Sequence, residues 1–115
     1  WCVFIGCTIE QTGQGAAGIR YSEFSGGMVE SCLIQYNHLG VIFNDYIRAA
    51  VYSSLFQHNR LSAFCAMRDI DQQAEVELVD NTICANSVTE YFSNGIWYGD
   101  HRPGKLTTRG NRENW

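Results

Sequence analysis

Short runs of alternating apolar and polar residues follow one another along the chain, and four of them share one pattern of side-chain types. Each block opens with a small or polar residue and has a large apolar residue at its third position; the blocks begin at Cys7, Cys32, Ser54 and Asn81. The sixth position is Asn in three blocks, at Asn37, Asn59 and Asn86, and a fifth block begins at Asn111. Alternation with a period of two predicts short β-strands.

A second set of blocks reads small, apolar, variable, apolar, small and acidic, at residues 18–23, 40–45, 62–67 and 95–100. Met67 replaces the acid in the third block, and the fourth opens with Gly95. The block starts are 22, 22 and 33 residues apart. The eleven additional residues of the last step require an inserted loop, and the polar segment 68–75 can supply much of it.

Repeats of this length predict a β-solenoid, because one unit cannot bury its own apolar face and stacked copies can. We expect an all-β parallel β-helix of about four coils that forms a segment of a longer helix, with no domain boundary within residues 1–115. Equivalent residues then stack about 4.8 Å apart, the spacing of neighbouring strands. Two columns are expected to face the core: Ile19, Val41, Ala63 and Ile96, then Tyr21, Phe43, Cys65 and Tyr98.

The recurring Asn has two interpretations, and both place a turn there. Stacked amides can hydrogen-bond along the stack, or Asn can simply tolerate a left-handed turn.

The competing fold is a small α+β domain with a helix over residues 60–79. Apolar residues there follow helical spacing only in part, and no convincing cap precedes them.

Composition narrows the classes of partner. Only 17% of the residues are charged, and the net charge is −4 with the eight Lys and Arg scattered, which argues against nucleic acid. No apolar stretch approaches the roughly 18 residues of a membrane span. The five cysteines form no CxxC pair, so we expect small buried side chains rather than a zinc or redox site.

These blocks resemble the repeats of right-handed parallel β-helix proteins of the pectin-lyase-like class, whose coils carry Gly-Ile/Val-x-aromatic-x-Asp strands and Asn-x-Ile turns. The resemblance covers about residues 3–115. It implies a right-handed helix, a polysaccharide ligand of acidic or neutral type, and an extracellular, periplasmic or virion-associated protein. The polygalacturonase elements and the Tyr-Gly-Phe/Ile-Asp-Pro-His run of uronan epimerases are absent, so no family's catalytic set transfers.

The acidic position of the second block set supplies the catalytic candidates. Glu23 and Asp45 are equivalent residues one coil apart, hence about 5 Å apart, and Asp100 lies roughly 10 Å from Asp45. Retaining and inverting glycosidases separate their two carboxyl groups by about 5–5.5 Å and about 6.5–9.5 Å, respectively. In the alternative interpretation, each acid accepts backbone N–H bonds in the following turn.

No cofactor or metal is assigned. A Ca²⁺ site of the pectate-lyase kind would need clustered carboxylates, and only Asp69 and Asp71 form a dense acidic pair.

The loop 100–105 concentrates ionisable side chains directly after two aromatic residues. His101 can act as an acid or base, and Arg102 and Lys105 can neutralise the carboxylate of a uronate. The alternative is a solvated loop.

Strand alternation predicts that Arg20, Phe64 and Trp97 point outward and, together with the loop, bind substrate. Exposed large aromatics usually mark a contact surface, and a pyranose ring presents an apolar face to an aromatic side chain. In the alternative interpretation, a loop or a neighbouring subunit covers them.

Two functions follow from these expectations. The first is a polysaccharide-active protein of glycoside hydrolase or lyase type. The second is a non-catalytic solenoid segment of an adhesin or phage tailspike that provides rigidity, glycan attachment and homotrimer contacts as part of a longer chain. An enzyme would gather the acidic column and the loop 100–105 around one groove, whereas a spacer would leave them dispersed and solvated.

Overall fold

The computed structural model describes residues 1–13, 17–86 and 96–114, and within them it contains strands and turns without any helix. One five-stranded sheet, sheet A, consists of β1 (Cys2–Ile5), β4 (Gly26–Glu30), β7 (Arg48–Tyr52), β10 (Glu75–Val79) and β13 (Lys105–Arg109). The second, sheet B, consists of β2 (Thr8–Glu10), β5 (Leu33–Gln35), β8 (Leu55–Gln57), β11 (Thr82–Cys84) and β14 (Arg112–Asn114). The four-stranded sheet C consists of β3 (Ala17–Tyr21), β6 (Leu39–Phe43), β9 (Ser62–Ala66) and β12 (Trp97–Tyr98).

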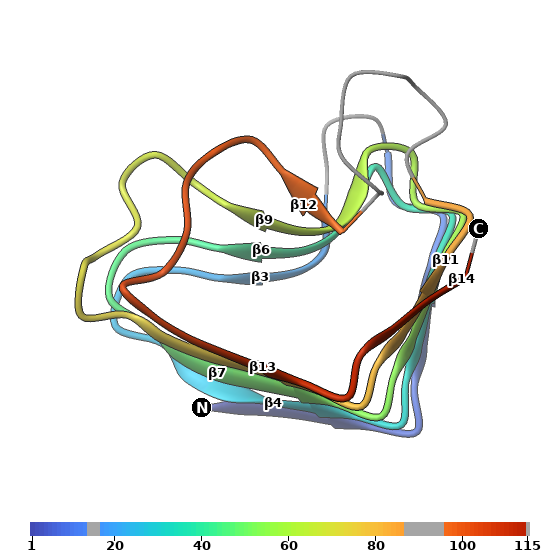
Figure 1. The fold of residues 1–115 in the computed structure, drawn as a ribbon, viewed down its shortest axis with the longest axis horizontal. Helices are drawn as coiled ribbons and strands as arrows, with labels where there is room; N and C mark the ends of the chain where they lie inside the picture. The colour runs from blue at the N-terminus through green and yellow to red at the C-terminus, as the bar shows by residue number, and fades with distance from the viewer. Residues whose placement is uncertain (14–16, 87–95, 115) are drawn as a thin grey trace.

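Each strand pairs in parallel with the strand three positions away along the chain, such as β4 with β1 and β7. Viewed along the stack, the three sheets form three sides around one core (Figure 1). The chain is therefore a parallel β-solenoid, as predicted, and the alternative helix over residues 60–79 is wrong, because β9 and β10 occupy that segment. The right-handed sense stays a prediction. The described part of the chain holds no helix with the length and apolar character to cross a membrane.

The coils differ in length mainly at their corners, although β12 is also shorter than its equivalents β3, β6 and β9. Hydrogen bonds between equivalent residues of successive coils span 25, 22, 27 and 30 positions. Part of the longer third step lies in residues 67–74, between β9 and β10. Gly95 of the predicted fourth block lies outside the described residues.

The interior is filled by columns of equivalent apolar side chains. In sheet A, Val29, Val51 and Leu78 are register partners and buried. In sheet B, Ile34, Phe56 and Ile83 form the corresponding column. Sheet C adds aromatic rings, with Tyr21 stacked on Phe43 at 6.5 Å between centroids. This stack was predicted, and it belongs to the same core cluster as the aliphatic columns.

The predicted register of β9 is wrong by one residue. Val41 pairs with Phe64 instead of Ala63, whereas Val41 pairs with Ile19 as predicted. A shift of one residue exchanges the two faces of a strand. Phe64 therefore joins the core, and Cys65, expected inside, packs in a second apolar cluster with Leu39 and Ile42.

Because β12 pairs with β9, its register relative to β3 and β6 is also shifted by one residue from the predicted one. Trp97 pairs with Phe64 and packs against the core, while Tyr98 pairs with Cys65 and packs against the second cluster. The outward Trp97 and inward Tyr98 that the sequence predicts are both wrong for the same reason.

The recurring Asn residues form a hydrogen-bonded ladder at the corner after sheet B. The Asn59 side-chain oxygen accepts from the backbone N–H of Asn37, and the Asn86 oxygen accepts from that of Asn59, at 3.2 and 2.9 Å. Each amide nitrogen donates to a strand carbonyl of an earlier coil, as Asn59 does to Ile34 at 3.1 Å. Stacking is therefore the correct interpretation. The left-handed backbone lies at the preceding residues, Tyr36, His58 and Ala85.

A second ladder, which was not predicted, occupies the corner after sheet A. Backbone N–H groups donate in turn to the side chains of the next coil along the column Cys7, Cys32, Ser54, Asn81 and Asn111. A residue of positive φ again precedes each member: Gly6, Ser31, Ser53, Asp80 and Gly110. Each of these two corners thus has a residue with left-handed backbone, followed by a residue whose side chain accepts a hydrogen bond from a backbone N–H of the neighbouring coil.

Replacing Asn59 with Ala tests the importance of the Asn ladder. The change leaves the Asn37 N–H and the Ile34 carbonyl without their partner inside the fully buried corner. We expect a loss of about 2–4 kcal/mol in the free energy of unfolding, measured by urea denaturation. The matched control, Gln73→Ala at an exposed turn, should change stability by no more than about 0.5 kcal/mol. Equal effects of the two substitutions would refute the role of the ladder.

The buried Tyr21 makes stability sensitive to alkaline pH. Burial raises the pKa of its phenol from 10.0 to about 12, and its hydroxyl donates to the Cys2 carbonyl at 3.3 Å. Between these two pH values the unfolded chain binds fewer protons than the folded chain, so stability falls as pH rises. We expect Tyr21→Phe to reduce this fall by roughly 2 kcal/mol. Chemical denaturation of both proteins between pH 9 and 12 measures it, and parallel curves would contradict the assignment.

Candidate functional site

The acidic column lies at the corner that joins sheet C to sheet A, on the left of Figure 1. Glu23 and Asp45 occupy equivalent turns after β3 and β6, and both have positive φ, 59° and 58°. An Asp45 carboxylate oxygen accepts from the backbone N–H of Glu23 at 2.9 Å. The structure therefore brings these two catalytic candidates together, and it also gives Asp45 the backbone-capping role of the alternative interpretation.

Glu23 and Asp45 line a surface cleft of about 530 Å³, which we call the corner cleft; its lining is Glu23, Phe24, Asp45, Tyr46, Asp69 and Asp71. Phe24 is 91% exposed, and its ring centroid lies 6.1 Å from that of Tyr46 at an interplanar angle of 48°. The cleft thus combines an open aromatic pair with four carboxyl groups.

The carboxylates of the corner cleft face no lining cation, since none of its six lining residues is Lys, Arg or His. Asp71 accepts from the Gln73 N–H at 2.7 Å, and its own N–H donates to the Asp45 carbonyl at 2.9 Å. Within residues 1–13, 17–86 and 96–114, no three His, Cys, Asp or Glu side chains are arranged to hold a metal ion. The cleft offers acceptors for hydroxyl or ammonium groups and would repel an anion.

The loop 100–105 lies at the same corner, but its residues do not line the corner cleft. Asp100 and His101 are exposed. The Arg102 guanidinium donates to the carbonyls of Gly99 and His101 at 2.8 Å and lies 4.7 Å from the Trp97 ring centroid. Lys105 pairs with Glu75 at 3.2 Å. The predicted set of Glu23, Asp45, Asp100 and His101 is therefore not gathered around one cleft.

The outward aromatic platform predicted from Phe64 and Trp97 does not exist. Phe64 is completely buried, 5.7 Å from the Trp97 centroid, because the register shift turns both rings toward the core. Arg20 is exposed, as expected for an outward position. Ile42, its register partner on the neighbouring strand β6, is covered within the second apolar cluster.

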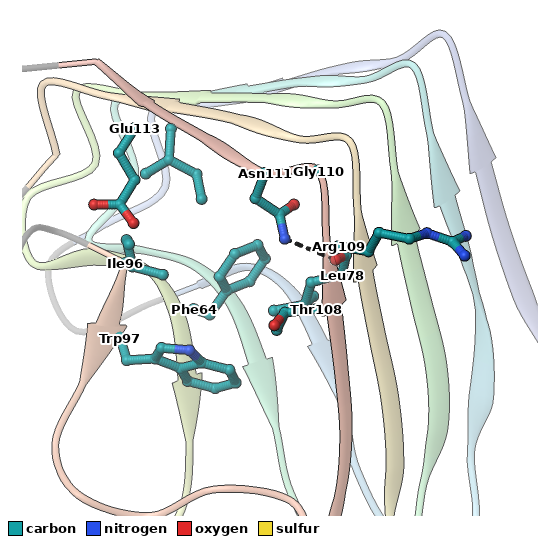
Figure 2. Close-up of a pocket in the computed structure, with 10 residues that line it drawn as sticks. Phe64, Leu78, Ile96, Trp97, Thr108, Arg109, Gly110, Asn111 and Glu113 are labelled. Carbon is teal, nitrogen blue, oxygen red and sulfur yellow. Dashed lines mark hydrogen bonds between the residues drawn. The ribbon is translucent and has the colours of Figure 1, made fainter.

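A second cavity opens where the core columns end at the last described coil (Figure 2). It has a volume of about 330 Å³, and we call it the end cup. Phe64, Leu78, Ile83 and Trp97 form its apolar part. Thr108, Asn111 and Glu113 contribute polar groups from β13, the following corner and β14.

Two of the cysteines, Cys32 and Cys65, are buried. Burial raises the pKa of the Cys65 thiol and is the largest cause of the raised pKa of Cys32. All five cysteines are free. Cys32 and Cys65 are buried, as predicted, whereas Cys7 and Cys84 are half-buried and Cys2 is exposed, so the prediction of small buried side chains holds for two of the five.

Sequence reasoning missed several lining residues, although the signals were present. An aromatic residue follows the acid in two coils, at Glu23-Phe24 and Asp45-Tyr46. At the end cup, Glu113 stands at the third position of the fifth block, where the other four blocks have a large apolar or β-branched residue. The available signal was a residue whose type differs from that of its equivalents in the other blocks.

No protein-family model, curated protein or solved structure matches this chain. The β-solenoid assignment therefore depends on the strand pairing described above, and the resemblance to the pectin-lyase-like class stays a prediction.

Proposed function

We propose that this chain is a glycan-binding, non-catalytic segment of a β-solenoid protein, and that the corner cleft binds the sugar. The observation that carries the proposal is the exposed Phe24 beside Tyr46 in a cleft that four carboxyl groups also line. Aromatic rings can pack on the apolar face of a pyranose, and carboxylates accept hydrogen bonds from its hydroxyls. A polysaccharide ligand is also what the resemblance to the pectin-lyase-like class implies.

The charge of the corner cleft favours a neutral glycan over a uronate. Four carboxyl groups line it without a cation, so a uronate carboxylate would meet like charges. The two cations expected to neutralise a uronate have other partners, since Arg102 binds backbone carbonyls and Lys105 pairs with Glu75.

Binding also fits the arrangement better than catalysis does. An enzyme would hold its acids around one groove, and Asp100 and His101 lie outside the corner cleft. Asp45 already accepts a backbone hydrogen bond, which suits a structural carboxylate.

Phe24→Ala and Tyr46→Ala test the aromatic pair. We expect the chain to bind neutral oligosaccharides of glucose, galactose, mannose or xylose in isothermal titration calorimetry. Each substitution should weaken the Kd about tenfold, because each removes an aromatic contact worth on the order of 1.4 kcal/mol.

The matched control is Tyr36→Ala, which removes a half-exposed ring stacked on His58 at another corner and should leave the Kd unchanged. Oligogalacturonate should bind at least about tenfold more weakly than the neutral sugar. Absence of binding to every neutral oligosaccharide, or equal binding of oligogalacturonate, would overturn the proposal.

Glycoside hydrolysis is the second candidate, because Glu23 and Asp45 line the same cleft from adjacent coils. Incubation of the chain with the glycan that it binds should release no new reducing ends if the proposed binding function is correct. Release that Glu23→Gln and Asp45→Asn both abolish, while glycan affinity is retained, would establish a hydrolase instead.

A further inference from the structure

A second hollow shares the aromatic pair with the corner cleft. It has a volume of about 200 Å³ and lies on the side of the stack, where the corner meets sheet A. We call it the Arg48 hollow; its lining is Trp1, Phe24, Ser25, Gly26, Tyr46 and Arg48, from three successive coils. Because Phe24 and Tyr46 also line the corner cleft, a ligand that packs on the two rings can enter both hollows.

Arg48 gives this hollow a positive charge that the described part of the chain leaves unpaired. Its exposed side chain takes part in no hydrogen bond or ion pair with residues 1–13, 17–86 and 96–114. Glu75, its register partner on β10, pairs with Lys105 at 3.2 Å instead. A guanidinium presents a planar set of N–H donors that matches the two oxygens of a carboxylate, so the hollow suits an anionic group.

Ser25 supplies a second polar group to the Arg48 hollow. Its hydroxyl oxygen is buried and has no hydrogen-bond partner among the described residues. The Ser25 carbonyl accepts from the backbone N–H of Arg48 at 3.2 Å, which holds the two residues side by side. Buried hydroxyl groups are rarely left unpaired, so this one is available to a ligand that enters beside Arg48.

From this arrangement we propose that the Arg48 hollow binds a uronate, and that the glycan is a heteropolysaccharide in which an acidic sugar adjoins a neutral one. This inference rests on the proposed glycan-binding function. Four carboxyl groups and no cation line the corner cleft, whereas Arg48 has the only charged side chain among the six that line its hollow. A neutral sugar therefore suits the first hollow and an acidic sugar the second. A polymer of uronates alone would place a carboxylate against the acids of the corner cleft.

The experiment compares trisaccharides that differ only at C6. Cellotriose and the corresponding galactose and mannose trisaccharides are each tested in neutral form, with either terminal sugar oxidised to the uronate, and with every sugar oxidised. Isothermal titration calorimetry measures binding to the whole chain. For a trisaccharide that binds, we expect one of the two monouronates to have a Kd about tenfold lower than the neutral form, and the fully oxidised form to bind at least about tenfold more weakly. Arg48→Gln should remove the advantage of the monouronate and leave the Kd of the neutral sugar within about twofold.

The matched control is Arg112→Gln, which removes an exposed arginine from β14 on sheet B and should leave every Kd unchanged. Neutral trisaccharides that bind with no gain from a single uronate would overturn the inference and leave the proposed function intact. A gain that persists in Arg48→Gln, or that Arg112→Gln also removes, would overturn it too, because the carboxylate would then be bound elsewhere or attracted by charge in general. Failure of every neutral trisaccharide to bind would instead count against the proposed function itself.

Discussion

Every strand in the described part of the chain is hydrogen-bonded to the equivalent strand of a neighbouring coil. This parallel pairing is the constraint on which the other features depend. It sets the distance between equivalent residues at one strand spacing, so each position must suit the same position above and below it. An aliphatic residue therefore recurs where the column faces the core, as Val29, Val51 and Leu78 do.

The parallel pairing of strands also constrains the corners of the coils. A turn at the end of sheet A or sheet B must redirect the chain identically in every coil, or the following strands would lose register. The left-handed residue supplies the change of direction, and the ladder side chain after it satisfies the N–H of the coil below. Such backbone is strained for a residue other than glycine, by an amount on the order of 1 kcal/mol. Its recurrence at Ser31, Ser53 and Asp80 shows that the ladder and the strand pairing outweigh that strain.

The sequence predicts the solenoid and the Asn ladder because both repeat a residue type at a fixed place. It fails for β9 because one residue is inserted between Asn59 and Phe64, where side-chain types alone leave two registers open. Ala63 and Phe64 are both apolar, so either can continue the column of Ile19 and Val41. The structure selects Phe64, which fills more of the space beside Phe43, with 6.2 Å between the ring centroids. The second ladder was not predicted because its residues are of different types. Their side chains carry a thiol, a hydroxyl or an amide, and they have in common only that each accepts a hydrogen bond from a backbone N–H.

The two candidate sites lie where the stacking constraint is relaxed. At the corner between sheets C and A, one hydrogen bond, from the Glu23 N–H to Asp45, takes the place of a continuous ladder, and the turn lengthens after β9. Phe24, Tyr46 and the carboxylates gather at this corner. At the end cup, β13 and β14 have a partner on one side only among the described strands. In a solenoid, the side chains at regular positions must suit the equivalent positions of the neighbouring coils, so side chains that serve a ligand are expected where the coils are irregular, as at the corner between sheets C and A.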